Sequence, residues 1–298
     1  MFEPELRNDV IRRIRAENRE TIVKFAEALR RVQTDPQSLS FDFLSDLVDT
    51  GRGICKPLSE QLASLYRTPD IFQLDQPLTP LHDVARRLVL CQTAFACACG
   101  LVTYINETFM QQRNRGYLIV RCLMSYARLY CLHLKDFLDM PDDYELGEEQ
   151  IEDGSFSQSD TIGSALLYNL DSIRKVYSTL KDFESFDENY LTRRLTDLLA
   201  LTHTIVDALS SKLEEKYLGK DIFDPDLRFP KSHDLARRLL ITGQVFLMSS
   251  LLYRDPRVIE FANNNRNFFS LYTHFYDLVI SGYLLALGDI LACQELPN

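Results

Sequence analysis

The amino-acid sequence predicts an all-α protein built from two tandem, internally duplicated antiparallel helical bundles, each with about four long helices. Three observations favour this fold class. Apolar residues recur at spacings of three, four and seven over long stretches, glycine makes up only 11 of the 298 residues, and the chain resembles itself after a shift of 151 positions. An α-solenoid of stacked helical pairs is the alternative architecture.

The internal resemblance is clearest in one motif. The segment 82–88, HDVARRL, aligns without a gap with the segment 233–239, HDLARRL, and the tripeptide DIF precedes both. Residues 22–95 share 22 identities in 74 positions with residues 173–246, whereas composition alone gives about four or five. We therefore interpret the two halves as copies of one helical unit.

The long helices are predicted from their apolar periodicity and their end signals. We expect the first helices at residues 5–33 and 161–183, and the fourth helices at residues 115–138 and 266–292. The third helix of each half opens at the HDxARR motif, where proline and hydroxyl residues provide start signals.

The second helix is expected to differ between the halves. In the second half, Ser185 and Glu188 have capping-box spacing and start a helix that runs to about residue 217. The corresponding stretch of the first half contains Gly51, Gly53 and Pro57, which predict a kink or a split in that helix.

The net charge of −10 is concentrated between the halves. From Asp136 to Ile173 there are eleven acidic residues and no lysine or arginine, so the rest of the chain has 43 − 11 = 32 acids against 33 bases. This composition favours a solvated connector. We predict a helical bundle over residues 1–138, an acidic flexible linker over 139–160 and a second bundle over 161–298, with the linker as a ligand for a basic surface as the alternative role.

Cysteine usage and the N-terminal sequence predict an intracellular protein. The seven cysteines lie mostly in apolar runs and form no CxxC pair, as is typical of buried thiols in a reducing compartment. The first residues have no secretory signal pattern. We expect the cytoplasm, with the nucleus as the alternative. Residues 88–105 are uncharged, but the matching apolar run, 239–253, is shorter, so we predict buried bundle helices and no membrane span.

The duplicated motif is predicted to be a structural clasp that ties an interhelical loop to the next helix. Each motif aspartate lies in a first helical turn, where a carboxylate complements the helix dipole. The arginines that follow are expected to pair with carboxylates of the upstream loop. The predicted clasp residues are Asp70, His82, Asp83, Arg86, Arg87, Asp221, His233, Asp234, Arg237 and Arg238.

The sequence predicts no metal site, no cofactor and no catalytic residues. A duplicated metal site at the His-Asp pairs would need further duplicated ligands, yet His203 aligns with Arg52. The acids Asp139, Asp142 and Asp143 resemble the magnesium motif of all-α isoprenoid synthases, but Pro141 interrupts them and no second motif is evident. Phosphate-loop and serine-nucleophile motifs are absent from the sequence, and the near-neutral bundles argue against nucleic acid.

The fourth helices differ most between the halves. Basic residues recur every seven positions in the first half, whereas tyrosine, valine and alanine occupy these positions in the second, next to a cluster of phenylalanines. One interpretation is that the basic face of the first-half helix is solvated, whereas the apolar face of the second-half helix is more buried. The other interpretation is that both faces bind proteins. The candidate partner-binding residues are Arg121, Arg128, Lys135, Phe268, Phe269 and Tyr272.

These observations favour a non-enzymatic intracellular adaptor or scaffold that binds partner proteins, through an acidic segment or an amphipathic helix, on the faces of its bundles. The alternative is a small-molecule or lipid-binding helical protein, or an enzyme, with a ligand pocket in a bundle core. An enclosed pocket with converging histidines or acids would favour the alternative. A filled core with an exposed apolar patch would favour the adaptor.

Overall fold

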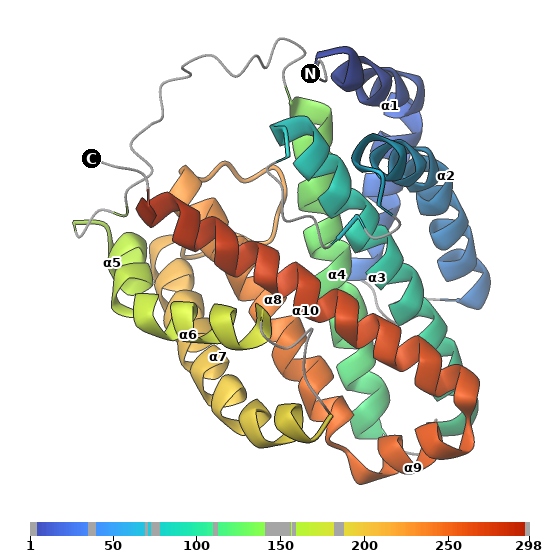
Figure 1. The fold of residues 1–298 in the computed structure, drawn as a ribbon, viewed down its shortest axis with the longest axis vertical. Helices are drawn as coiled ribbons and strands as arrows, with labels where there is room; N and C mark the ends of the chain where they lie inside the picture. The colour runs from blue at the N-terminus through green and yellow to red at the C-terminus, as the bar shows by residue number, and fades with distance from the viewer. Residues whose placement is uncertain are drawn as a thin grey trace. The chain divides into compact units, whose positions relative to one another are not determined.

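A computed structural model of the chain describes residues 5–34, 40–68, 71–72, 78–109, 113–140, 156, 159–181 and 188–295. These residues form ten α-helices and no strand, which confirms the all-α class (Figure 1). The helices are α1 (Glu5–Thr34), α2 (Phe41–Tyr66), α3 (Pro80–Phe109), α4 (Arg113–Asp139), α5 (Thr161–Tyr168), α6 (Leu170–Lys181), α7 (Glu188–Lys216), α8 (Lys231–Tyr253), α9 (Pro256–Asn264) and α10 (Arg266–Glu295).

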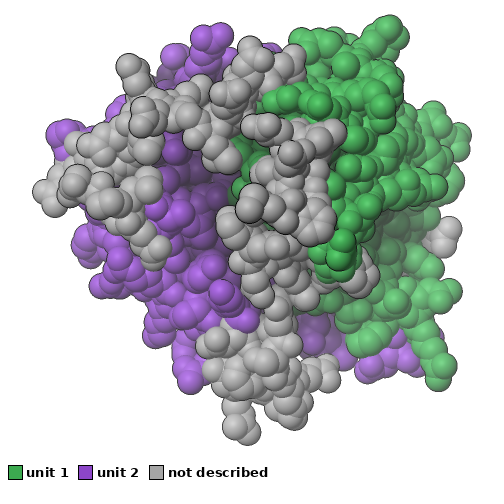
Figure 2. Space-filling view, turned by 45° about the horizontal axis from the view of Figure 1, so that its top comes forward, with its two compact units in different colours: residues 1–147, 265–278 green, residues 148–264, 279–298 purple. Residues whose placement is uncertain are grey.

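The chain divides into two compact units, coloured green and purple in Figure 2. Unit 1 contains Met1–Gly147 and Asn265–Leu278, and unit 2 contains Glu148–Asn264 and Val279–Asn298. The predicted boundaries assign all of α10 to the second bundle. In the structure, the first half of α10, up to Leu278, belongs to unit 1. Most of the predicted linker, 139–160, lies outside the described residues.

Unit 1 contains a four-helix arrangement in which α1 and α3 each pack against α2 and α4. Its centre is the fully buried Tyr130 of α4, whose ring lies 5.1 Å from that of Phe25 and 6.3 Å from that of Phe95. The Tyr130 hydroxyl donates a hydrogen bond to Gln92 Oε1 at 3.1 Å. The aromatic side chains therefore fill the middle of the bundle, and the one polar group among them has a partner.

Helix α2 runs unbroken from Phe41 to Tyr66, so the predicted split does not occur. Ser40 caps its start by accepting a hydrogen bond from the Phe43 amide at 3.2 Å. Pro57 removes the amide that would bond to the carbonyl of Gly53. Because Gly53 is exposed, water can hydrate that carbonyl, and the helix continues.

Unit 2 contains α5, α6, α7, α8 and the second half of α10. Helices α5 and α6 pack on α7, and α7 packs on α8. From α10, Tyr283 stacks on Phe246 at 5.2 Å and donates a hydrogen bond to Thr202 at 3.3 Å. The single helix predicted over 161–183 is two helices, which meet at Asn169, and α9 was not predicted.

Within the part of the chain that the structure describes, three helices have the length and apolar composition of a membrane-crossing helix. These stretches are Pro80–Tyr104, Lys231–Tyr253 and Arg266–Cys293, and 67%, 67% and 56% of their respective most apolar windows are buried within the structure.

All seven cysteines are free and buried, and six of them belong to unit 1. Burial raises the pKa of Cys55 and Cys122 to about 12 and that of Cys97 to about 11. The reactive thiolate is therefore scarce near neutral pH.

We expect the thiols of Cys55, Cys97 and Cys122 to react with a disulfide reagent at pH 8 at least about 100-fold more slowly in the native protein than in denaturant. Absorbance kinetics with Ellman's reagent, followed by mass mapping of the modified residues, measure both rates. Modification of Cys97 in native buffer at the denatured rate would contradict the burial described above.

Candidate functional site

The motif aspartates hold the arginines that follow them. In unit 2, Asp234 pairs with Arg237 and accepts a hydrogen bond from Arg238 Nε at 2.7 Å. In unit 1, Asp83 makes the same two contacts, with Arg86 and with Arg87 Nε at 2.6 Å. Burial raises the pKa of both carboxyl groups, but the arginine charges outweigh it and lower the pKa overall.

These ion pairs give the arginines a partner that the prediction did not include. The prediction named upstream acids, and each arginine contacts the aspartate three or four residues earlier in the same helix. The spacing explains this, because side chains three and four positions apart share a helix face. Asp70, one of the five clasp residues predicted in the first half, lies outside the described residues.

The motif histidines bind the end of the preceding helix. His82 Nδ1 lies 2.7 Å from the Tyr66 hydroxyl, and His233 Nδ1 lies 2.5 Å from the Tyr217 hydroxyl. The two ring pairs also have matching edge-on geometry, at 5.7 Å and 5.8 Å. Each histidine, at the start of its helix, therefore bonds to the end of the long helix before it: His82 links α3 to α2, and His233 links α8 to α7.

In unit 2 the loop before α8 is attached through Arg237. Its Nη1 donates a hydrogen bond to the Asp224 carbonyl at 3.1 Å, and its guanidinium lies 4.4 Å from the centre of the Phe229 ring. The Asp221 side chain accepts a hydrogen bond from the Phe223 amide at 2.9 Å, which shapes the same loop. The loop and the helix start are thus brought together.

Asp160, predicted as the last residue of the flexible linker, is instead an anchored residue that the prediction missed. It caps α5 by accepting a hydrogen bond from the Gly163 amide at 2.9 Å. It also contacts His233 Nε2 at 2.8 Å and pairs with Lys216. Burial raises the pKa of Asp160, but these hydrogen bonds outweigh it and hold the pKa at about 2. The sequence contained a signal for this role, because aspartate is a preferred N-cap residue and Asp160 directly precedes the predicted helix start at residue 161.

We expect the substitution Asp160→Asn to lower the free energy of unfolding by about 2 kcal/mol at neutral pH. The native pKa lies below the ordinary value of 3.8, so the ionised carboxylate stabilises the fold above about pH 4, and this contribution disappears as the pH falls to about 2. Asparagine keeps the helix cap, so the loss reports the charge. Urea unfolding of both proteins across this pH range measures the difference.

The matched control for this prediction is Asp171→Asn, which changes an exposed aspartate on α6. Its unfolding free energy should stay within about 0.5 kcal/mol of the wild type at every pH. A stability difference for Asp160→Asn that is the same at low and neutral pH would contradict the role of its charge.

The predicted basic positions of α4 lie at the surface to different degrees. Arg121 is exposed, whereas Arg128 and Lys135 are half-buried, and Lys135 Nζ lies 3.5 Å from Asp139.

The predicted aromatic positions of α10 do not form one surface. Phe268 and Tyr272 are 1% and 3% exposed, and only Phe269 is exposed. Phe268 stacks on Tyr272 at 5.9 Å and meets the edge of Tyr104 at 6.0 Å. This face of α10 is apolar because it packs inside unit 1, so Phe268 and Tyr272 are core residues in this structure.

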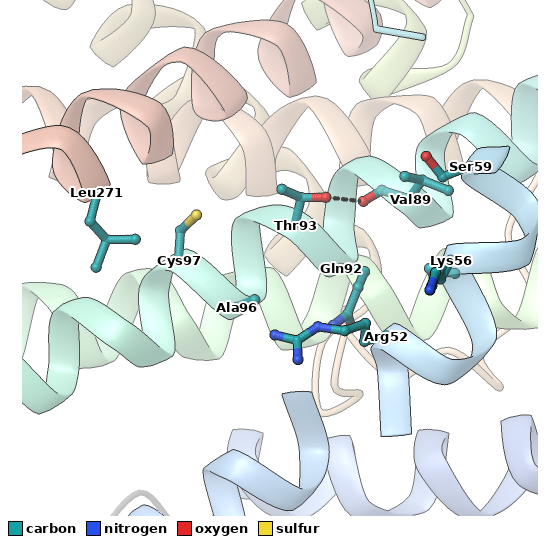
Figure 3. Close-up of a pocket in the computed structure, with 10 residues that line it drawn as sticks. Arg52, Lys56, Ser59, Val89, Gln92, Thr93, Ala96, Cys97 and Leu271 are labelled. Atoms are coloured by element: carbon teal, nitrogen blue, oxygen red, sulfur yellow. Dashed lines mark hydrogen bonds between the residues drawn. The ribbon is translucent and has the colours of Figure 1, made fainter. Parts of the chain in front are cut away.

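Unit 1 has an open groove of about 410 Å³ between α2 and α3 (Figure 3). One residue of α10 completes it. The lining residues are Arg52, Cys55, Lys56 and Ser59 of α2, Val89, Gln92, Thr93, Ala96 and Cys97 of α3, and Leu271 of α10.

The groove has an apolar base and one basic edge. Val89 and Cys97 are buried, whereas Arg52 and Lys56 are exposed and lie one turn apart on α2. Arg52 is 3.1 Å from Asp49 and Lys56 is 3.8 Å from Glu60, and both pairs are exposed to solvent. The ten lining residues include no acid and no histidine.

The polar side chains at the base of the groove are engaged within unit 1. Gln92 Nε2 donates to the Val48 carbonyl at 3.0 Å, and Thr93 Oγ1 donates to the Val89 carbonyl at 2.8 Å. The lining thus combines two exposed cations with an apolar base.

The groove residues differ from those 151 positions later in unit 2. Larger side chains, Gln244, Leu247 and Met248, replace Thr93, Ala96 and Cys97, and His203 and Asp207 replace the two basic residues. His203 and Asp207 lie 2.7 Å apart. A position-by-position comparison of the two halves could have indicated this site. None of the predicted partner-binding residues belongs to it.

Among the described residues, no three histidine, cysteine, aspartate or glutamate side chains are placed to hold a metal ion. Comparison with protein-family models, curated proteins and solved structures gives no match.

Proposed function

We propose that this chain is a non-enzymatic intracellular adaptor, made of two duplicated helical bundles, whose main partner-binding face is the groove of unit 1. The observation that carries the proposal is a contrast between the units. They repeat the same internal contacts at a spacing of 151 residues, but five residues of the groove lining differ from those at the matching positions of unit 2: Arg52, Lys56, Thr93, Ala96 and Cys97.

The repeated contacts support descent from one copied unit. The tyrosine–histidine bond and the aspartate–arginine pairs occur in both units. In addition, the side chain of Asn18 donates to the Ile14 carbonyl at 2.8 Å, and that of Asn169 donates to the Ala165 carbonyl at 2.9 Å. Contacts repeated at one spacing favour duplication over independent origin.

One pair of core positions differs between the units in a compensating way. In unit 1, α2 carries the small residue, Gly51, and α3 the larger one, Gln92. At the matching positions of unit 2, α7 carries the larger residue, Thr202, and α8 the small one, Gly243. In both units the hydroxyl of a central tyrosine bonds to the larger residue of the pair. Such exchanges preserve packing.

The differences at the groove are not of this kind. Small side chains at Thr93 and Ala96 leave open the space between α2 and α3, and Arg52 and Lys56 add charge at its edge. Apolar contact bordered by polar residues is the usual composition of a protein-binding face. The groove is therefore a binding surface of unit 1 that unit 2 does not share.

The test fills the groove with the residues of the other unit. The variant Thr93→Gln/Ala96→Leu/Cys97→Met should fold with an unchanged unfolding midpoint, because unit 2 carries these side chains at the matching positions. Proximity labelling in cells should then show a set of proteins whose labelling falls at least about fivefold. The control Gln244→Thr/Leu247→Ala changes unit 2 and should leave that set unchanged.

Identical labelling by wild type and filled variant would overturn the proposal. Native mass spectrometry of the purified protein distinguishes the alternative function, because a small molecule that co-purifies with the wild type and is lost from the filled variant would indicate a ligand carrier or an enzyme.

A further inference from the structure

Resting on the proposed binding role of the groove, we propose that its ligand is an acidic amphipathic helix that lies lengthwise between α2 and α3. Three properties of the groove carry this inference: its dimensions, its hydrogen bonding and its charge.

The groove has the length of a short helical segment. Its lining residues run from Arg52 to Ser59 on α2 and from Val89 to Cys97 on α3. Seven or eight helical residues span about 11 Å, or two turns. Side-chain ridges of one helix pack into the grooves of others, with anchors at spacings of three, four and seven.

The hydrogen bonding of the groove favours a helix over an extended peptide. An extended ligand needs partners for its own backbone amides and carbonyls. The base of the groove offers few, because Gln92 is bonded to the Val48 carbonyl and to Tyr130, and Thr93 is bonded to the Val89 carbonyl. A helix satisfies its backbone internally and presents side chains alone.

The base of the groove accommodates an aliphatic anchor. Val89 and Leu271 supply apolar walls, and Ala96 has a short side chain that leaves space above α3. Val89 and Ala96 are seven residues, or about 11 Å, apart on α3. Two leucine or isoleucine side chains two turns apart on the ligand helix could therefore contact Val89 at one end and Ala96 and Leu271 at the other. Each anchor would gain affinity from the apolar area that it removes from water.

The charge of the groove selects acidic ligands. Arg52 and Lys56 are four residues apart on the exposed edge, so they match two carboxylates four residues apart on a ligand helix. Their present partners, Asp49 and Glu60, are exposed acids of α2, and exposed ion pairs of this kind hold the side chains only weakly. Both cations can therefore turn toward carboxylates of the ligand.

The test selects peptides from a displayed library of random 16-residue sequences, with the full-length protein as bait and the groove-filled variant for counter-selection. We expect the enriched peptides to be net acidic, with aliphatic residues at spacings of three, four and seven. Bound to the protein, a synthetic peptide from this set should gain helicity by circular dichroism.

Affinity measurements on that peptide separate charge from shape. Fluorescence anisotropy should show binding about fivefold to tenfold weaker for Arg52→Glu/Lys56→Glu, and about twofold tighter for Asp49→Asn/Glu60→Gln. The matched control, Lys212→Glu, changes a half-buried lysine of unit 2 that pairs with Glu215 and should leave affinity unchanged.

The outcomes distinguish this inference from the proposed function. Groove-dependent peptides that are basic, or that bind in an extended form, would overturn the acidic-helix ligand and leave the binding role intact. Enrichment of no groove-dependent peptide would overturn both. Equal affinity for wild type and Arg52→Glu/Lys56→Glu would overturn the role of charge in recognition.

Discussion

Replacing Gly51 by threonine is expected to lower the free energy of unfolding by about 3 kcal/mol. A Cβ atom at this position would overlap Gln92 Oε1 and lie 3.0 Å from Phe25 Cζ. Gln92 cannot move aside without loss, because its amide group is bonded to the Val48 carbonyl at 3.0 Å and to the Tyr130 hydroxyl at 3.1 Å. Breaking these bonds in the core leaves buried polar groups without partners.

Adding Gln92→Gly to Gly51→Thr should restore about 2 kcal/mol. The double variant carries the residue pair of unit 2, where the Thr202 hydroxyl accepts a hydrogen bond from Tyr283 at 3.3 Å. The hydroxyl introduced at position 51 can receive Tyr130 in the same manner. Guanidinium unfolding of the four proteins of the cycle, followed by far-ultraviolet circular dichroism, measures the coupling.

A coupling below about 0.5 kcal/mol would mean that the two sites are independent. That result would remove the compensating exchange from the support for duplication. The single variant Gln92→Gly serves as the reference for the loss of the amide bonds, because it removes them without adding bulk at position 51.

The substitution Asp234→Asn is expected to cost about 3 kcal/mol of unfolding free energy. Arg237 and Arg238 have side chains that are 5% and 11% exposed, and both form an ion pair with this carboxylate. A neutral amide removes the negative charge that both of these largely buried guanidinium groups contact. Asp83→Asn should have a similar effect in unit 1, because Arg86 and Arg87 are buried to nearly the same degree.

The control for this prediction is Asp207→Asn, which removes one member of the exposed His203–Asp207 pair on α7. Its effect should stay below about 1 kcal/mol. Equal losses for Asp207→Asn and Asp234→Asn in guanidinium unfolding would show that burial of the motif arginines contributes nothing.

The sequence predicted the long helices well because their signal is local. Helices α1, α4 and α7 match the expected ranges to within two residues at either end, since apolar periodicity and caps act over a few turns. The break at Asn169 and the continuity of α2 through Pro57 were not predictable in this way, because solvent access and neighbouring helices decide them.

The candidate site was less accessible to prediction because it joins distant parts of the chain. Periodicity shows that one face of α10 is apolar, but it does not show that Tyr104 covers Phe268 or that Leu271 reaches the groove. The motif was recognised from its repetition, yet the partners of its arginines depended on helix geometry. The sequence shows that Arg52 and Lys56 differ from His203 and Asp207, the matching residues of the second half. This difference alone does not indicate a groove.

The division of α10 between the units has a practical consequence for truncation. Excising residues 1–147 as a separate protein would leave behind the segment that packs on Tyr104 and Tyr126, and with it Leu271. Such a fragment would present aromatic side chains to water and would be prone to aggregation. Reconstitution of this half therefore requires residues 265–278, supplied by a circular permutation or as a peptide added in trans.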